Sequence, residues 1–295
     1  MTPKMTPPMT PEVTPQMATD VTPAMTPAIA PPITPAMITT AEVLRFEELT
    51  LNTAPARHQY FYDGWVLRAS AGDARRSNSV TALYPSLSPA TLPLDEKISV
   101  CEAWYARHGQ TPMFRLSDAL SPAGLDALLA ARGYRREINT VVMTVSLQGL
   151  PAATAPAPGI RLVERSIGDG IADVHRMKGT AGDEASRDIE RQKLWRGKEI
   201  FLSLRSINGL LACGMARIEA GHACIFSLRT PPPEQGKGYA QQLVAHLLAW
   251  GREQGAHTGF LQVDENNFPA IAVYRRFGFV ARYPYWQRIG IQEQA

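Results

Sequence analysis

The sequence lacks the features of a secreted, membrane-spanning or metal-binding protein. It has three cysteines, an odd number that argues against a disulfide framework, and Cys101, Cys213 and Cys224 show no metal-ligand spacing. No apolar run approaches the roughly 18 residues that a membrane helix needs, and the N-terminus has neither the basic nor the apolar region of a signal peptide. We therefore expect a cytoplasmic protein without metal or membrane contact, whose cysteines are small core residues.

The chain also has little excess charge of either sign. The 30 Lys and Arg residues nearly balance the 27 Asp and Glu residues, and no basic stripe interleaves with aromatic residues. A nucleic-acid partner is therefore not expected. With 45% hydrophobic residues the composition is that of an ordinary globular protein, and 295 residues are enough for about two domains. The oligomeric state does not follow from the sequence.

Residues 1–37 follow a four-residue repeat. An apolar residue recurs at every fourth position from Met1 to Met37, and the position two residues later is proline except at Thr19 within the repeat. Proline removes amide donors and disfavours the α conformation in the residue before it, so a disordered, polyproline-like tail is predicted. The tail is interpreted either as a ligand for a proline-recognition groove or as an expanded repeat ahead of the true domain, with Met37 as the start.

The rest of the chain divides at a Pro/Ala-rich linker, residues 151–158, into a first half at 38–150 and a second at 159–295. In the first half, residue periodicity predicts strands at 64–69, 79–84, 113–116 and 141–147 and helices at 95–108 and 122–131. In the second half it predicts strands at 160–164, 200–206, 210–219, 222–230 and 259–263 and helices at 168–178, 183–196, from 238, and at 268–277.

The two halves end alike. Segments 117–137 and 264–282 each run from a strand end through a short loop and a helix to a glycine followed by an aromatic residue. An offset of 145 residues places Gly133 on Gly278 and Tyr134 on Phe279. The same offset superimposes the helix at 95–108 on the helix after Gly238. This correspondence indicates two related halves.

Residues 235–240 read Gln-Gly-Lys-Gly-Tyr-Ala and join a predicted strand, which ends at Thr230, to a helix. The start of a helix has unpaired amides and partial positive charge, and glycine lets a phosphate approach the backbone closely. One interpretation is therefore a site for a phosphate-bearing ligand, and the other is a tight strand–helix connection. The spacing is not that of a nucleotide P-loop, because Gly238 stands where that loop has Ser or Thr.

These residues resemble the GNAT N-acetyltransferase superfamily. Gln235–Ala240 fits the family motif Gln/Arg-x-x-Gly-x-Gly/Ala. Downstream, a second segment resembles the signature Asn-x-x-Ala-x-x-x-Tyr-x-x-x-Gly-Phe, with Asn267, Ala270, Tyr274, Gly278 and Phe279 at its defined positions. The resemblance covers about residues 158–290. The first half looks like a degenerate copy, which is the tandem layout of mycothiol-synthase-like members.

The resemblance implies an acetyl-CoA site in the second half, with acetyl-CoA as co-substrate. The backbone at Leu228 and Thr230 would pair with the pantetheine arm as an added strand does. The pyrophosphate would be held by the amides of the loop formed by Gln235, Gly236, Lys237, Gly238, Tyr239 and Ala240. Lys237 is interpreted either as an electrostatic contact to the phosphates or as a solvated side chain.

Two residues of the second signature have implied roles. Asn267 resembles a family residue near the pantetheine, and it is equally suited to cap the following helix. Tyr274 corresponds to the tyrosine that protonates the departing CoA thiolate in the family, and its alternative role is that of a core aromatic. Tyr274 lies seven residues after Asn267 and four after Ala270, so the three are expected on one helical face.

The acceptor amine also needs a proton acceptor. Presenting an alkylamine of pKa about 10.4 in its neutral form at pH 7.5 costs about 4 kcal/mol, so a base or a water chain must take the proton. Many relatives carry a glutamate on the strand before the glycine loop, but residues 224–230 include no carboxylate. The spacing does not select among the remaining candidates, which are Asp183, Glu184, Glu219, His222 and Glu265.

The first half departs from the family pattern. By the offset of 145, Leu129 corresponds to Tyr274, and residues 91–95, with no glycine and with Pro93, correspond to the glycine loop. This half is therefore not expected to bind CoA. Two polar–aromatic clusters in it, at 63–65 and 75–79, either shape an acceptor pocket or cap strands.

The predicted fold class is therefore α/β, with tandem GNAT-like halves, each a mixed and mostly antiparallel sheet flanked by helices. The predicted function is acetyl transfer from acetyl-CoA to a primary amine, on a small molecule or on a protein. The alternative is a non-catalytic regulator that binds acyl-CoA.

The proline repeat generates a prediction. Deleting residues 1–37 should leave the melting temperature and the affinity for CoA unchanged, because a segment with this proline spacing cannot contribute a packed core. Differential scanning calorimetry and CoA titration of the two proteins check this. A loss of several degrees would mean that the tail packs on the folded body.

Overall fold

The computed structural model of the chain describes residues 38–70, 74–84, 92–180 and 182–291. The prediction of a disordered tail at 1–37 and the first residue of segment 91–95 lie outside this range. Within it the structure is a mixed α/β fold whose sheet is mostly antiparallel, which confirms the predicted fold class.

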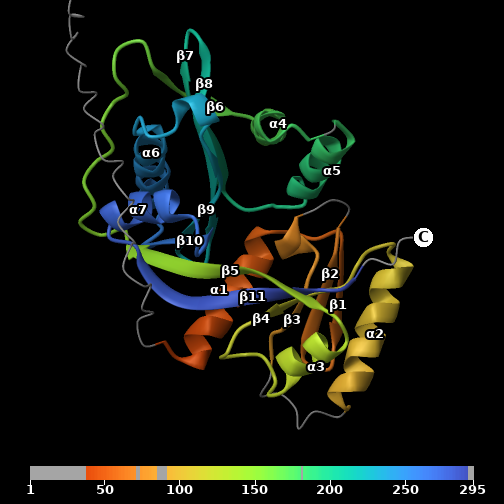
Figure 1. Ribbon diagram of the computed structural model, residues 1–295. Coiled ribbons are helices and arrows are strands. Elements are labelled where there is room, and N and C mark those ends of the chain that lie inside the picture. Colours follow the sequence, from red (N-terminus) through yellow and green to blue (C-terminus); the bar gives the residue numbers. More distant parts are fainter. Residues whose placement is uncertain (1–37, 71–73, 85–91, 181, 292–295) are drawn as a thin grey trace, which may run out of the picture. The chain divides into compact units, whose positions relative to one another are not determined.

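The described residues form one continuous 11-stranded sheet in the order β1-β2-β3-β4-β11-β5-β10-β9-β8-β7-β6 (Figure 1). Only the β3–β4 and β9–β10 pairs are parallel among these strands. The strands are β1 (His58–Tyr62), β2 (Trp65–Ala69), β3 (Val80–Ala82), β4 (Met113–Leu116), β5 (Arg135–Ser146), β6 (Arg161–Arg165), β7 (Glu199–Ser206), β8 (Gly209–Glu219), β9 (His222–Arg229), β10 (Thr258–Asp264) and β11 (Val280–Ile289).

Helices cover both faces of this sheet. Helix α6 packs on one face of the β7–β9 region, and α4 packs on the other (Figure 1). The helices are α1 (Thr40–Thr53), α2 (Leu94–Arg107), α3 (Leu125–Ala131), α4 (Ile167–Lys178), α5 (Gly182–Gln192), α6 (Tyr239–Glu253) and α7 (Phe268–Arg276), with 3-10 turns η1 (Arg75–Ser77) and η2 (Pro232–Glu234).

The order of elements repeats at the predicted offset. From β1 to β5 the first half runs in the same order as the second half from β7 to β11, and α2 and α3 correspond to α6 and α7. Gly133 and Gly278 both have φ +84°, which an L-residue rarely adopts, and each follows a helix. The next amide, of Tyr134 or Phe279, donates back to the carbonyl of Leu129 or Tyr274. The sequence echo is therefore a shared helix ending.

The corresponding last strands of the halves are exchanged. Strand β5 ends the first half, yet its residues 140–146 pair with the whole of β10 of the second half, from Thr258↔Ser146 to Asp264↔Thr140. Strand β11 ends the second half and pairs with β4 of the first half at Trp286↔Leu116. The two halves therefore share one sheet instead of forming two, a result that the predicted domain boundaries did not anticipate.

Helix α1 was not predicted from the sequence, although a start signal is present. Thr39 caps it: its side chain accepts from the Glu42 amide, and the Glu42 carboxylate accepts from the Thr39 amide at 3.0 Å. Its apolar residues Val43, Phe46 and Leu49 are buried against residues of both halves, including Phe260.

The sequence also did not predict strands β1 and β11. For β1 the reason is that most of its residues are exposed and it lies at the sheet edge, so it lacks the alternation of a half-buried strand.

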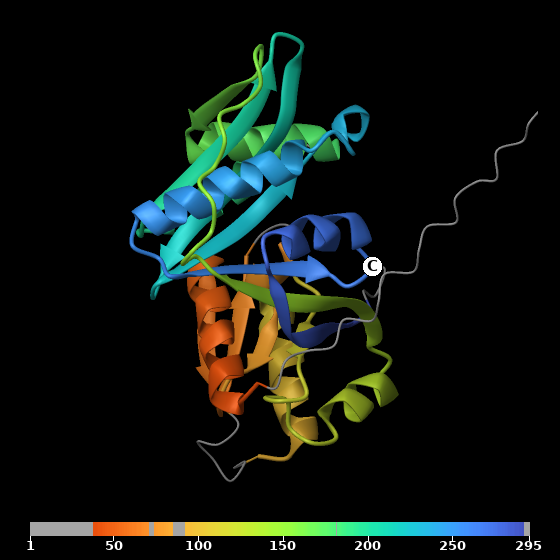
Figure 2. The same ribbon diagram turned by 90° about the vertical axis from the view of Figure 1, so that its left-hand side faces the viewer.

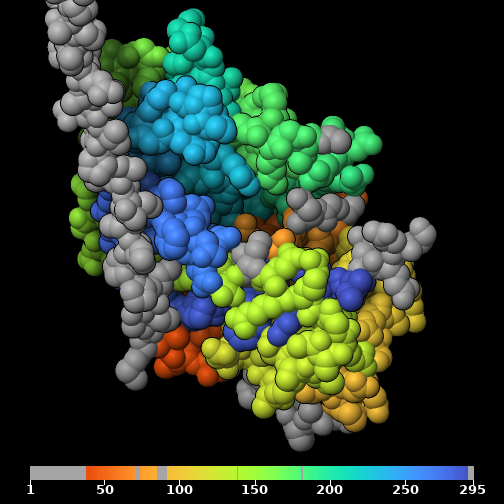
Figure 3. Space-filling model, in the orientation of Figure 1, coloured from red at the N-terminus to blue at the C-terminus, as the bar shows by residue number. Residues whose placement is uncertain are grey.

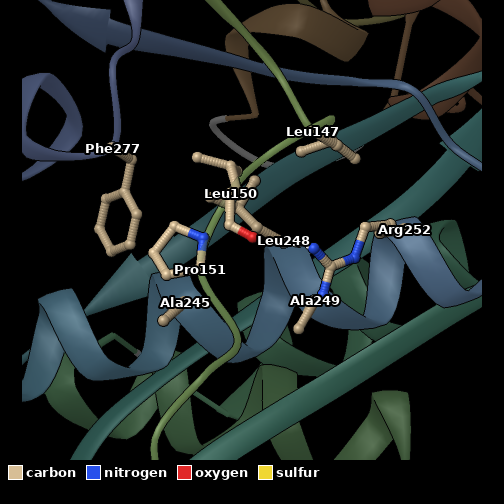
Figure 4. Close-up of a pocket in the computed structure, with 8 residues that line it drawn as sticks. All are labelled: Leu147, Leu150, Pro151, Ala245, Leu248, Ala249, Arg252 and Phe277. Carbon is tan, nitrogen blue, oxygen red and sulfur yellow. Dashed lines mark hydrogen bonds between the residues drawn. The ribbon is translucent and has the colours of Figure 1, made fainter.

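The linker between the halves runs along α6 (Figure 2). Leu150 and Pro151 lie over this helix beside Phe277, and the Arg252 guanidinium donates to the Leu150 carbonyl at 2.9 Å (Figure 4). The space that these side chains leave measures about 10 Å³, so it holds at most one water molecule. The linker is therefore packed on the second half.

A buried ion pair ties α1 to the exchanged strand. Glu47 accepts from Arg115 Nε at 2.7 Å and from its Nη2 at 2.8 Å, and both side chains are 2% exposed. Tyr283 on β11 donates to the same carboxylate at 2.6 Å. Although burial opposes the charge on Arg115, the neighbouring Glu47 raises the pKa of its guanidinium far above the usual value. This cluster joins α1, β4 and β11.

The buried pair generates a prediction. Glu47→Gln keeps the shape but leaves Arg115 charged and without a counter-ion, so we expect a loss of about 3–5 kcal/mol in the free energy of unfolding. Urea denaturation of the wild type and the variant measures it. The matched control is Glu48→Gln, because Glu48 is 37% exposed and its pair with Arg45 is worth about 0–1 kcal/mol. Equal losses in both variants would contradict this account.

Candidate functional site

Strands β9 and β10 diverge after a short parallel contact. They pair only from His222↔Thr258 to Cys224↔Phe260, and beyond that β10 stays with β5 while β9 stays with β8. A bulge lies on the free part of β9, where Ser227 and Leu228 oppose the single residue Gly214, and Ser227 has φ +53°. The β10-facing backbone of β9 beyond Cys224 therefore has no strand neighbour. We call this opening the fork.

A cleft of about 490 Å³ opens from the fork, within the range of small-molecule sites. The surface is hollowed there, between the green helices of the second half and the lime-coloured strand β5 (Figure 3). Its lining comes from both halves: η1 from the first, and α5, β9, β10 and α7 from the second. Of the residues predicted for the site, Leu228, Asn267 and Tyr274 line it.

The glycine loop follows the end of β9. Gly236 and Gly238 have φ +77° and +86°, and a Cβ built on either one would meet nothing within 4 Å. Gly238 is the N-cap of α6 and offers no side-chain cap. The first helical hydrogen bond runs from the Gln242 amide to the Gly238 carbonyl, so the preceding amides of the helix face open space. This arrangement can accept an anion.

Side chains fix the loop at its two ends. Gln235 donates to the Thr230 carbonyl at 3.3 Å, which ties the loop to the end of β9. The Lys237 ammonium lies 3.1 Å from the Glu234 carboxylate and is 53% exposed. Across the cleft, Asn267 caps α7 by accepting from the Ala270 amide at 3.2 Å. The capping role of Asn267 is thus observed.

Tyr274 points from α7 into the region where the fork opens. Its side chain is 7% exposed, its ring lies 5.8 Å from that of Phe279, and its hydroxyl has no hydrogen-bond partner among the described residues. Burial raises the pKa of Tyr274 to about 12. The phenol is therefore protonated at any physiological pH and its proton is available to a group bound in the cleft.

Arginines hold the cleft walls together. Arg191 on α5 donates to Ser77 of η1 at 2.9 Å and pairs with Asp188. Arg217 on β8 donates to the Thr53 carbonyl of α1 at 2.6 Å and to Glu199 at 2.9 Å. The contacts to Ser77 and Thr53 connect the second half to the first, and the two carboxylate contacts lie within the second half.

The carboxylates of the cleft differ in their partners. Burial alone would raise the pKa of Asp188, but the charge of Arg191 and hydrogen bonds from His175 and Arg191 lower it. Asp264 ends β10 and accepts from the Asn266 amide at 2.9 Å. In the part of the chain that the structure describes, Asp264 forms no ion pair, so it is the carboxylate of the cleft that no cation neutralises.

The five proton-acceptor candidates from the sequence lie elsewhere, since none belongs to the cleft lining. Glu219 accepts from Asn52 at 2.8 Å beside the turn that precedes β9, and Glu265 accepts from Asn139 at 2.6 Å. His222 donates from Nδ1 to the Ala220 carbonyl at 2.8 Å, and burial lowers its pKa. The sequence missed Asp188 and Asp264 because only the folded sheet brings them to the cleft.

The two polar–aromatic clusters of the first half, at 63–65 and 75–79, lie in different parts of the structure. Arg75, Arg76 and Ser77 line the cleft, whereas Trp65 is buried in the core of the first half with the Lys97 ammonium 4.2 Å above its ring. The second cluster therefore has the position expected of an acceptor pocket. Leu129, the counterpart of Tyr274, is fully buried in the same first-half core.

The remaining side chains with reactive potential are inert. All three cysteines are free and buried, and burial raises the pKa of Cys101 and Cys213 to about 12. Over the ranges described, no group of His, Cys, Asp and Glu side chains is arranged to hold a metal ion. No helix in those ranges is long and apolar enough to cross a membrane.

Comparisons with known proteins agree with this geometry. Residues 40–286 match the family model described as "Probable histone acetyltransferase Rv0428c C-terminal". Over 240 residues the chain is 24% identical to an uncharacterized N-acetyltransferase, YobR, of Bacillus subtilis, and the match covers 81% of this chain and 94% of the relative.

Solved structures share the fold. A GCN5-related N-acetyltransferase from Kribbella flavida superposes with a TM-score of 0.64 at 15% identity, covering 87% of this chain and 97% of that one. A tandem GNAT protein from the clavulanic acid biosynthesis pathway superposes with a TM-score of 0.51 at 16% identity, covering 68% of this chain and 70% of that one. The resemblance read from the two sequence motifs is confirmed, including the tandem layout.

Proposed function

The chain belongs to the family of the Rv0428c C-terminal region, within the GNAT N-acetyltransferases, and on that premise we propose that it transfers an acetyl group from acetyl-CoA to a primary amine. The acceptor is a small-molecule amine or a protein amine. The observation that carries the proposal is the fork between β9 and β10: Tyr274 lines the cleft that opens from it, and the glycine loop follows the end of β9 at the start of α6. The relatives and structural neighbours are acetyltransferases, so the interpretation as a non-catalytic regulator gains no support.

The loop fits a pyrophosphate. The space where a Cβ of Gly236 or Gly238 would stand is open, so phosphate oxygens can reach the amides of Gly236 to Ala240 directly. The start of α6 adds its positive partial charge. Lys237 is already paired with Glu234, which supports a secondary role for its side chain.

The fork fits the pantetheine arm. Beyond Cys224 the β10-facing edge of β9 has unpaired backbone groups, which can pair with an extended amide-bearing chain as they would with a strand. The bulge at Ser227 and Leu228 turns this edge, and Gly214 permits it because a Cβ there would lie 3.1 Å from Leu228. Leu228, Thr230 and Asn267 are accordingly the residues that flank the arm.

The acetyl transfer forms one carbon–nitrogen bond and breaks one carbon–sulfur bond. The nitrogen of the neutral amine forms a bond to the carbonyl carbon of the acetyl group, the carbon–sulfur bond breaks, and the sulfur leaves with the electron pair. Tyr274 donates its hydroxyl proton to that sulfur, or a hydrogen bond where the transfer is incomplete. Because the pKa of Tyr274 is about 12, above that of a thiol, donation accompanies bond breaking and does not precede it.

The amine proton leaves toward Asp264. This carboxylate lines the cleft and no cation neutralises it among the described residues, whereas Asp188 is bound by Arg191 and His175. A water molecule can relay the proton where the amine and Asp264 are not in contact. Deprotonation of the amine is favoured as the pH rises toward its pKa, so turnover should increase with pH.

The glycine loop generates a prediction. Gly238→Asp puts a side chain and a negative charge at the proposed pyrophosphate, so the affinity for CoA should fall at least about tenfold, which is about 1.4 kcal/mol. Isothermal titration calorimetry should also give one CoA per chain, since only the second half has a glycine loop. Two equivalent sites would contradict the assignment.

The control for backbone strain is Gly255→Asp. Gly255 has φ +89° and open space around its Cβ position, and it follows the other end of the same helix. Both substitutions impose the same strain on a left-handed residue, and the helix dipole makes Gly255→Asp the more destabilising of the two. An equal loss of CoA affinity in both variants would mean that strain, and not the phosphate site, is responsible.

Tyr274 generates a second prediction. Tyr274→Phe removes the hydroxyl but no carbon atom, so turnover on an accepted amine should fall about 10²–10⁴-fold while CoA affinity and the melting temperature change little. In the wild type the phenol keeps its proton below pH about 12, so its ionisation should not limit the rate at pH 7–10. Steady-state kinetics across that range measure both effects. An unchanged turnover number, with chemistry rate-limiting, would make Tyr274 a packing residue.

A further inference from the structure

The charge of the cleft lining is strongly one-sided. Two carboxylates, Asp188 and Asp264, face six cationic side chains. These six are Arg75, Arg76, Lys178, Arg191, Arg217 and Arg229. The whole chain carries a net charge of only +3, so this excess is concentrated at the site.

Half of these cations already have a carboxylate. Arg75 lies 3.1 Å from Glu137, Arg217 lies 2.9 Å from Glu199, and Arg191 pairs with Asp188. The other three, Arg76, Lys178 and Arg229, form no ion pair with any residue that the structure describes. Arg229 is exposed and Lys178 ends a helix, so solvent can balance their charges. Arg76 is the one that needs a different explanation.

Arg76 is only partly exposed, at the wall of the cleft. Its guanidinium lies 5.2 Å above the ring of Phe226, and its Nη1 is 3.5 Å from the Gln262 side-chain oxygen, which is a long and weak contact. Burial, together with the charges of Arg115 and Arg191, lowers the pKa of Arg76. A partly desolvated cation with no carboxylate partner is stabilised when an anion binds to it.

The surroundings hold Arg76 in place. Its carbonyl accepts from Arg68 at 3.0 Å, and the next residue, Ser77, accepts from Arg191 at 2.9 Å. Gln262 is oriented in turn, because its oxygen accepts from the Tyr285 hydroxyl at 3.0 Å. A cation fixed in this way binds an anion with little loss of conformational freedom.

Arg76 faces the point where the fork opens. Phe226 and Gln262 each stand two residues beyond the last paired residues of β9 and β10, Cys224 and Phe260. Tyr274 lines the same cleft as Arg76, whereas no residue of the glycine loop, 235–240, belongs to its lining. An anion at Arg76 therefore belongs to the acceptor and not to the diphosphate of CoA.

We propose that Arg76 binds an anionic group on the acceptor, so that the enzyme acetylates small primary amines that carry a carboxylate or a phosphate. This inference rests on the acetyltransferase function proposed above. A planar guanidinium binds both anions through paired hydrogen bonds. The same charge excess repels a lysine-rich protein tail, which is the kind of acceptor that the description of the family model suggests.

The test uses matched acceptors that differ in one charge. Glycine and leucine are compared with glycinamide and leucinamide, phosphoethanolamine with ethanolamine, and a lysine-rich peptide is added. Release of CoA thiol is followed with wild type, Arg76→Gln and Arg76→Lys, and the KM of acetyl-CoA is measured for each. Arg135→Gln is the control, since Arg135 is 69% exposed and lies outside the cleft.

We expect wild type to turn over the anionic member of at least one pair faster than the neutral member. Which pair shows this preference tells whether the bound anion is a carboxylate or a phosphate. Arg76→Gln should raise the KM for that acceptor about tenfold or more, since hydrogen bonds to charged groups are among the strongest. Its KM for acetyl-CoA and its kcat/KM for neutral partners should change less than about threefold. Arg76→Lys should recover part of the preference by retaining the charge.

Two outcomes would overturn the proposal. One is turnover of the neutral amines or the lysine-rich peptide in preference to the anionic amines. The other is an equal effect of Arg76→Gln on both members of every pair. Calorimetry of the same amines on the CoA-bound protein tests the inference without turnover, and equal binding of acid and amide would also overturn it. Thiol release with no amine at all would instead count against the acetyltransferase function.

Discussion

The exchange of β5 and β11 is the constraint on which the site depends. Because the whole of β10 pairs with the second part of β5, β10 cannot follow β9, and the two strands separate after Phe260. Because β11 pairs with β4, the first half is fixed beside the fork and η1 reaches over it. A sheet split into two independent halves would leave the cleft without its second wall. The first half thus contributes to function through position, although it has no glycine loop.

Buried arginines fix the two halves relative to each other, and burying their charges costs free energy. Arg191 and Arg217 cross from the second half to η1 and α1, and each also has a carboxylate partner. Arg115 is fully buried and is balanced by Glu47. Such pairs give limited net stability, because desolvation offsets much of the attraction, but removing one partner is costly. The charges of these three arginines therefore serve mainly to hold elements in register, whereas Arg76 has no carboxylate partner among the described residues.

The two halves show how one element order supports different roles. In each half a helix ends at a left-handed glycine, Gly133 or Gly278, and α2 of the first half corresponds to α6 of the second. In the first half Leu129 replaces Tyr274 and is buried, and β3 has three residues where β9 has eight. Among the described residues, β3 pairs with β2 without a register shift and extends only one residue, Ala82, beyond its pairing with β4. The first half, whose sequence has no glycine loop, therefore also lacks a fork among the described residues.

The sequence by itself determined the family, the glycine loop, Tyr274 and most of the regular elements, because these depend on local patterns: φ > 0 glycines, helical spacing and alternating strands. It did not reveal α1 as an element that packs on both halves, or the exchange of β5 and β11, because pairing partners far apart in the chain leave no periodic signal. The sequence offered the cluster at 75–79 as one of two possible acceptor pockets, and only the tertiary structure places it at the cleft. Arg76, Asp188 and Asp264 come from separate elements, and only the folded sheet brings them to one cavity.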